Sequence, residues 1–186
     1  MSLIPLGFWA ASGGGGGAGG FDLLETTTLT SSALSVTFSG LDAYSDYKHL
    51  QIRMVGRGDR ATSLADLWLR FNSDSGSNYA WHVLYGSGSS VGSIGYPSQP
   101  KIQTGYVTGS TFTSNGFAGT VTDILDFSST SKNTTIRSLT GMAGTNNQIR
   151  MFSGLWNSTS AVTSIQLLPE VDNLVAGSRF SLYGVK

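Results

Sequence analysis

The sequence has no cysteine, only four prolines, and an even balance of eleven basic and eleven acidic side chains. The missing cysteine excludes disulfide bonds and thiolate metal sites. A formal net charge of zero, with 12% charged residues, provides no long-range field to collect nucleic acid, so we expect no nucleic-acid partner. No apolar run approaches the roughly 18–20 residues that a membrane span requires, and we expect no membrane insertion.

Groups that could carry catalysis are equally scarce. His49 and His82 are the two histidines, so a zinc site would need carboxylates to complete it. Asp123 and Asp126 lie three residues apart in a strand-like run, and strand alternation would send them to opposite faces, which makes them a poor glycosidase pair. The sequence has no G-x-S-x-G motif between a strand and a helix, which is where a nucleophilic serine would be expected. We therefore expect no enzymatic activity, no metal and no cofactor.

Glycine is abundant, with twenty-five residues, and serine and threonine are frequent. From Phe21 onward apolar and polar residues alternate, and glycine-rich turns interrupt the alternation at short intervals. This pattern predicts one all-β domain over residues 21–186, an antiparallel two-sheet sandwich for which a jelly roll is the best-fitting form. The expected strands are 21–29, 34–38, 47–56, 64–71, 78–86, 101–107, 117–127, 133–144, 148–156, 161–168 and 179–185.

The alternation also predicts which side chains are buried. In the second expected strand, Leu34, Val36 and Phe38 should face the core. The strand at 78–86 is apolar on both faces, which predicts burial on both sides, either centrally in the sandwich or against another subunit. One of its faces carries Tyr79, Trp81, Val83 and Tyr85, and the other carries Ala80, His82 and Leu84.

Three polar segments are candidates for ligand-facing loops: 72–79, 86–100 and 144–148. The segment 86–100 is the longest polar, glycine-rich stretch and is expected to be an exposed loop, the alternative being a plain hairpin cover. The segment 72–78 has the oxygen spacing of a calcium loop, but His82 stands where the bidentate glutamate is expected, which favours a structural turn. The candidate residues in these loops are Asn72, Asp74, Asn78, Tyr96, Asn146 and Asn147.

The N-terminal residues 1–20 differ from the rest of the chain. An apolar tip precedes the glycines of 13–20, which form a flexible tether. We expect this arm to dock on a neighbouring protein, the alternative being an arm folded back across its own sandwich. The residues expected to make the contact are Leu3, Ile4, Leu6, Phe8 and Trp9.

Several segments of the sequence, which are distinctive in combination, resemble segments of structural proteins of tailed phages, especially phages that infect cyanobacteria and other aquatic bacteria. The segments are "GFWAASGGG", "YKHLQIRMVGRGDRA", "LRFNSDSGSNYAWHVLYGSGSSVGS", "VTDILDFSSTSKNTTIRSLTG", "SGLWNSTSAVTSIQLLPE" and "AGSRFSLYGVK". The resemblance covers essentially the whole chain. It implies a multimeric jelly-roll component of the virion, of the tail-fibre, appendage or capsid-decoration type, made in the host cytoplasm and bound to the shell or tail by its arm.

Two functions are therefore expected from the sequence. The first is a non-enzymatic virion structural protein, a decoration, cement or fibre component. It attaches to capsid or tail proteins through residues 1–20 and forms a homo-oligomer, with a trimer favoured. The second is a receptor-binding module that recognises host cell-surface glycans through its aromatic and amide-rich loops. A glycoside-cleaving enzyme is disfavoured by the missing carboxylate pair.

Overall fold

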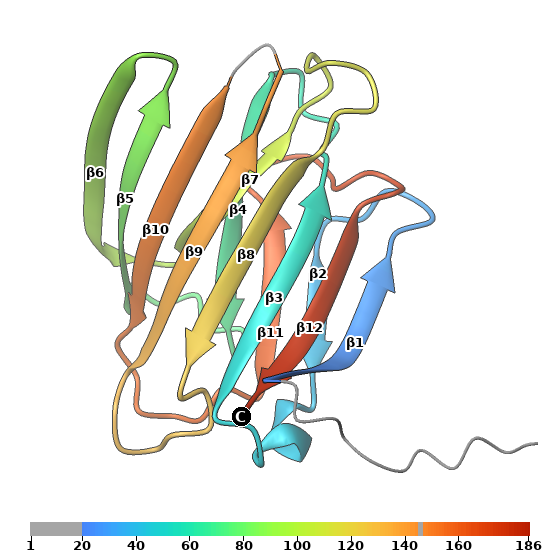
Figure 1. The fold of residues 1–186 in the computed structure, drawn as a ribbon. Coiled ribbons are helices and arrows are strands. Elements are labelled where there is room, and N and C mark those ends of the chain that lie inside the picture. Colours follow the sequence, from blue (N-terminus) through green and yellow to red (C-terminus); the bar gives the residue numbers. More distant parts are fainter. Residues whose placement is uncertain (1–19, 145–146) are drawn as a thin grey trace, which may run out of the picture.

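The structure, a computed structural model, describes residues 20–144 and 147–186 as two antiparallel β-sheets packed face to face (Figure 1). The larger sheet has eight strands in the order β1-β12-β3-β8-β9-β10-β5-β6, and the smaller has four in the order β2-β11-β4-β7. The predicted all-β, two-sheet antiparallel sandwich is confirmed, and its form is consistent with a jelly-roll-like fold.

The strands follow the alternating runs of the sequence closely. A short 3-10 helix at Leu41–Tyr44 follows β2. Within the described residues no helix is long and apolar enough to cross a bilayer. The strands are β1 (Phe21–Thr28), β2 (Val36–Ser39), β3 (His49–Gly56), β4 (Leu64–Phe71), β5 (Tyr79–Ser87), β6 (Ser90–Gln99), β7 (Ile102–Thr108), β8 (Ala118–Leu125), β9 (Thr134–Met142), β10 (Gln148–Trp156), β11 (Ser164–Pro169) and β12 (Arg179–Val185).

The apolar core fills the space between the two sheets. Its side chains sit at alternate strand positions, as the period of two requires. Neighbouring strands contribute aligned pairs, such as Phe180 opposite Met54 and Leu182 opposite Ile52. The largest completely buried side chains include Phe38, Phe71, Tyr79, Phe127, Phe152 and Phe180.

A buried ladder of hydroxyl groups joins the two sheets at β7. The Thr104 and Thr122 hydroxyls lie 2.9 Å apart, and Thr122 lies 2.9 Å from the hydroxyl of Ser138. Ser138 also donates to the carbonyl oxygen of Thr104 at 2.6 Å, so strand β7 is hydrogen-bonded to the facing sheet. All three residues are at least nine-tenths buried, and each hydroxyl is paired.

Gly105 lets β7 approach the larger sheet beside this ladder. A Cβ atom at Gly105 would lie 2.6 Å from the Thr140 hydroxyl and 2.9 Å from that of Thr120. Those two hydroxyls are themselves 2.9 Å apart and buried. A side chain at this position would have to displace a hydrogen-bonded pair. Glycine is therefore required here because of the close approach of β7 to these hydroxyls, and not because of its backbone angles.

Two expectations about strand 2 and the polar segment 86–100 are wrong. Leu34 is 74% exposed because β2 begins only at Val36, while Val36 and Phe38 are buried as expected. For the segment 86–100 the exposed loop is wrong and the alternative, a hairpin, agrees with the structure: it completes the β5–β6 hairpin, whose turn is formed by Gly88, at φ 57°, and Ser89. Its small polar residues occupy positions on an edge strand, where little packing demands large side chains.

Strand β5 is buried on one face alone. Tyr79, Trp81 and Val83 pack in the core, whereas His82 is exposed and Leu84 is 54% exposed on the opposite face. The expectation of burial on both sides within the sandwich is therefore wrong. The second reading, that another subunit covers this face, stays a prediction.

The described chain begins and ends at the same end of the sandwich (Figure 1). The Lys186 ammonium lies 2.9 Å from the Asp22 carboxylate, which also accepts a 2.9 Å hydrogen bond from the Tyr47 hydroxyl. The turn of the β5–β6 hairpin lies at the opposite end (Figure 1). We call the end with Asp22 and Lys186 the base, and the opposite end the tip.

The close approach at Gly105 generates a stability prediction. Gly105→Ala should lower the free energy of unfolding by about 1–3 kcal/mol, because the methyl group displaces the Thr120 and Thr140 hydroxyls. Gly20→Ala, just before β1 and outside this contact, is the control, since nothing lies within 4 Å of a Cβ there. It should leave the stability unchanged or raise it by up to about 1 kcal/mol. Urea titration at low micromolar protein measures both, and equal effects would contradict the account.

Candidate functional site

A cleft opens where the β5–β6 hairpin extends beyond the smaller sheet. The edge strand of that sheet, β7, forms one side of the cleft with β4, and β5, β6 and β10 form the other. Its volume is about 310 Å³. The lining residues are Asp66, Trp68, Trp81, Val83, Ile94, Tyr96, Gln99, Gln103, Tyr106 and Arg150. We call this the aromatic cleft.

Three aromatic rings form one wall of the aromatic cleft. Trp68 and Trp81 meet edge to face, with ring centroids 5.8 Å apart, and Trp81 packs on Tyr96 at 4.9 Å. The Lys101 ammonium lies 4.4 Å from the centre of the Trp68 ring. Both tryptophans are 8% exposed, whereas Tyr96 is 47% exposed. Tyr96 therefore offers an aromatic surface to a molecule arriving from solvent, and the tryptophans support it from behind.

Both tryptophans carry an unsatisfied polar group. Within the described residues, the indole N–H groups of Trp68 and Trp81 are buried and have no hydrogen-bond partner. Buried N–H groups in proteins are nearly always paired, with the chain or with ordered water, and these two are closed off from solvent.

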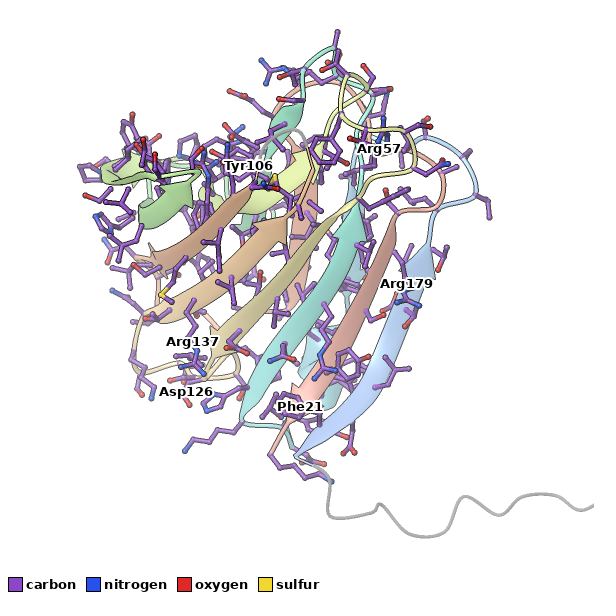
Figure 2. The ribbon with its side chains drawn as sticks, turned by 45° about the horizontal axis from the view of Figure 1, so that its top comes forward. Phe21, Arg57, Tyr106, Asp126, Arg137 and Arg179 are labelled. Atoms are coloured by element: carbon purple, nitrogen blue, oxygen red, sulfur yellow. The ribbon has the colours of Figure 1, made fainter. Side chains whose placement is uncertain are left out.

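The polar wall holds a carboxylate, an amide and a guanidinium in place. Gln103 donates from its Nε2 atom to Oδ1 of Asp66 at 2.8 Å. Arg150 donates to the Tyr106 hydroxyl at 2.8 Å and twice to the side-chain oxygen of Gln148, at 2.9 and 2.7 Å. Its guanidinium carbon lies 4.3 Å from the centre of the Tyr106 ring. Figure 2 shows Tyr106 on the side of the sandwich that carries the hairpin.

Burial shifts the titration of the groups in and beside the cleft. It raises the pKa of Asp66, and repulsion from Glu170 adds to this, while the Tyr106 hydroxyl and Arg150 act against it. Burial likewise raises the pKa of Tyr106 and lowers that of Lys101. Groups removed from water interact more strongly with polar atoms of a ligand, because the local dielectric is low.

This combination of groups can bind a polar molecule that also has apolar faces. Aromatic rings pack against C–H groups, while the carboxylate, amide and guanidinium exchange hydrogen bonds with hydroxyls. Across 20–144 and 147–186, no three histidine, aspartate or glutamate side chains gather as a metal site.

The loop residues expected to face a ligand do not form one site. Asn72 lies at the base and is engaged by its own chain: its amide donates to the carbonyl of Ala161 at 2.8 Å and accepts from the backbone N–H of Thr163 at 2.8 Å. Asn147 lies near the tip and accepts a 2.9 Å hydrogen bond from the N–H of Gly144. Asn146 and the arm residues Leu3, Ile4, Leu6, Phe8 and Trp9 lie outside the described residues.

Asp74 organises the segment 72–78 as a hydrogen-bonded turn. Its carboxylate accepts from the backbone N–H of Gly76 at 2.8 Å, the Asn78 amide at 3.0 Å, and the indole N–H of Trp156 at 2.8 Å. The bond to Trp156, followed by the bond to Asn78, holds the pKa of Asp74 below its usual value. N–H donors thus occupy the oxygens that a calcium ion would need.

Of the five expected loop residues that the structure describes, Tyr96 alone lines the aromatic cleft, and it does so from strand β6 rather than from a loop. Sequence reasoning missed Asp66, Trp68, Gln103 and Arg150. One signal was present in β4: Trp68 stands at a position where alternation places polar residues, between the buried Leu67 and Leu69. A large aromatic there indicates a second partly covered face.

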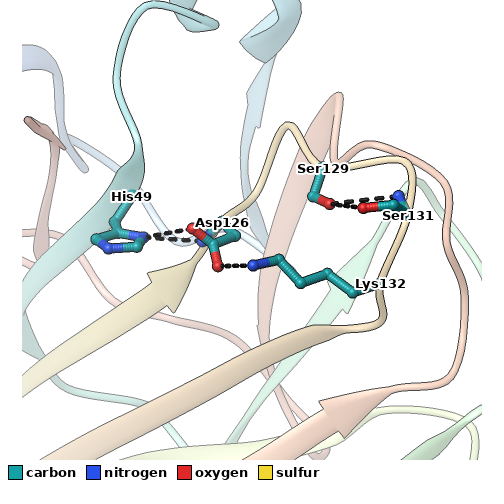
Figure 3. Close-up of polar contacts among 5 residues, drawn as sticks. All are labelled: His49, Asp126, Ser129, Ser131 and Lys132. Carbon is teal, nitrogen blue, oxygen red and sulfur yellow. Dashed lines mark hydrogen bonds and ion pairs between the residues drawn. The ribbon is translucent and has the colours of Figure 1, made fainter.

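The two aspartates discussed as a carboxylate pair have separate partners. Asp123 accepts from Arg137 and Gln51, at 2.8 and 2.7 Å. Asp126 lies beyond the end of β8 with φ 49°, so strand alternation does not apply to it. Figure 3 shows its carboxylate between His49 and Lys132 at the base, and its backbone N–H donates to the His49 ring at 2.9 Å.

No family model matches the chain, and no curated protein matches it in sequence. One solved structure with a similar course of the chain is the exo-inulinase from Aspergillus awamori, with a TM-score of 0.40 and 11% identity. The match covers 89% of this chain and 29% of the enzyme chain, so this chain spans less than a third of that protein. A similarity at this level carries no functional argument.

The turn at Asp74 generates a prediction that includes pH. Asp74→Ala should lower the free energy of unfolding by about 1–3 kcal/mol at pH 7, because the buried indole N–H of Trp156 loses its charged acceptor. A lowered folded-state pKa stabilises the fold above the unfolded value of about 3.9, and that contribution is lost as the pH falls further. The difference between wild type and variant should therefore shrink below about pH 4.

The control for this experiment is Asp46→Ala, an exposed aspartate at the same end of the molecule. It should change the stability by less than about 0.5 kcal/mol at every pH. The free energies of unfolding of wild type and both variants are measured with urea at pH 7, 5 and 3.5. An Asp74→Ala effect that does not change with pH would contradict a stabilising role for the carboxylate charge.

Proposed function

We propose that this chain is a non-enzymatic structural protein of a tailed-phage virion, a decoration, cement or fibre component. The observation that carries the proposal is the arrangement of the two ends of the domain. Strand β1 starts at the base beside the C-terminal Lys186, and the tip of the sandwich lies at the opposite end (Figure 1). Attachment of the arm to capsid or tail proteins would present the tip outward.

The composition of the arm supports the same proposal. The first nine residues of the arm include five large apolar side chains. Burying half of their surface on a neighbouring protein would contribute several kcal/mol of binding free energy, at ~25 cal/mol per Å². Fully extended, the twenty residues up to Gly20 can reach roughly 65–70 Å, more than a domain of this size needs to cover itself. Assembly as a homo-oligomer on the particle is part of the proposal.

Deletion of residues 1–20 tests the attachment. The truncated chain should fold with unchanged strand content, because the contacts of Asp22 with Tyr47 and Lys186 are retained. It should be absent from particles assembled in its presence, whereas the full chain is incorporated. The measurement is the protein content of purified particles, with Leu23→Ala in the full chain as the control. Normal incorporation of the truncated chain would contradict the proposal.

A second function, recognition of a cell-surface glycan, is favoured by the aromatic cleft. Exposed Tyr96 provides a stacking surface for the apolar face of a sugar ring. Gln103 and Asp66 form a fixed pair of polar groups in the same cleft. Sugars combine apolar ring faces with hydroxyl groups and therefore match both walls.

Tyr96→Ala tests this second function. On an array of host-surface glycans, the full chain should bind at least one structure, and the variant should lose about tenfold or more in affinity, as expected when a central aromatic contact is removed. Phe21→Ala is the matched control, because Phe21 has the same 47% exposure but lies on β1, at the far edge of the sheet. Absence of glycan binding by the full chain would leave the structural role alone.

A further inference from the structure

The outer face of the larger sheet carries a row of apolar side chains across four adjacent strands. Leu84 of β5 stands opposite Met151 of β10, Met151 opposite Leu139 of β9, and Leu139 opposite Val121 of β8. Each exposes between 40% and 58% of its surface. We call these four side chains the ridge. Monomeric proteins rarely leave a contiguous apolar patch of several hundred Å² uncovered.

A second row, two residues further along the same strands, contains three glycines. Gly86 pairs with Ile149, Ile149 with Gly141, and Gly141 with Gly119. We call this row the trough. Together with part of the ridge, Gly86 and Ile149 line a shallow hollow of about 570 Å³ on this face.

Nothing within the described chain requires these glycines. Their strand pairings are in continuous register, and their backbone angles lie outside the left-handed region. A Cβ atom would meet no atom within 4 Å at Gly119 or Gly141, and would make one ordinary contact at Gly86. Glycine weakens a strand, and in a sheet it often marks a place where another chain comes close.

We propose that the ridge and trough form a self-complementary interface through which two copies of this chain pair face to face about a two-fold axis. Such an axis, lying between the two rows and parallel to them, turns the ridge of one copy onto the trough of the other. Leu84, Leu139 and Val121 then each stand over a glycine of the partner copy. Met151 meets Ile149.

Charge and area agree with a second copy as the occupant. None of the eight positions in the two rows is charged. The nearest charges on this face are Arg53, opposite Val121, and the ion pair of Asp123 with Arg137, and each is already bonded within its own copy. Six apolar side chains, with Val91 at 88% exposure beside the trough, supply a large part of the roughly 800 Å² that each partner buries in a stable dimer. The pairing rests on the homo-oligomer of the proposed function and names its surface, with a two-fold dimer in place of the trimer that the sequence favours.

The test is the mass of the purified full chain in solution by light scattering. Wild type should give twice 19.6 kDa. Met151→Glu should give a monomer, because it places a charge in the ridge. Gly141→Val should also give a monomer, since its side chain fills the trough while the monomer itself has space for it. Leu23→Glu, on the exposed outer surface of β1, is the control and should stay dimeric.

A cooperative thermal transition shows that each variant is folded. A monomeric wild type, or an oligomer that survives both Met151→Glu and Gly141→Val, overturns the inference. A dimer that is lost on deletion of residues 1–20 also overturns it, because the arm would then be the occupant of this face. The mass measurement needs no particle, so its failure is distinct from a failure of virion incorporation.

Discussion

The hydroxyl ladder between β7 and the β8–β9 pair fixes how the two sheets lie on each other. Apolar packing alone has little directional preference, so two sheets could slide without much loss. Hydroxyl groups bond only in one register, and movement of β7 would leave the buried Thr104 hydroxyl and carbonyl without their partners on the larger sheet. Thr122 and Ser138, which face each other on β8 and β9, would keep their bond to each other. Gly105 makes the approach possible, because any side chain there would meet two further hydroxyls.

The position of β7 decides where the aromatic cleft opens. With β7 over β8, β9 and β10, the smaller sheet reaches β5 but leaves β6 largely uncovered, so the outer strand of the hairpin projects beyond the core. Trp81 and Tyr96 close over the edge of the smaller sheet. Trp81 contacts Trp68 of that sheet, and Tyr96 packs on Trp81. Arg150 of β10 then bridges to Tyr106 of β7, which ties the cleft to the same strand.

The sequence predicts the strands well because period two is a local property. Burial of Leu50, Ile52 and Met54 follows from their spacing alone. The sequence left 86–100 open between a loop and a hairpin because an edge strand tolerates glycine and serine, so its composition matches that of a loop. The aromatic cleft was missed for another reason: Trp68, Gln103 and Arg150 lie on three strands, and only the order of strands in the sheets brings them together.

The aromatic cleft and the ridge can act at the same time, because strand alternation separates them. Val83 lines the cleft and the next residue, Leu84, belongs to the ridge on the opposite face. Arg150 and Met151 divide in the same way on β10. Pairing through the ridge would leave both clefts open in one assembly. Two weak glycan contacts held together would then bind a surface far more tightly than either alone, without any new contact.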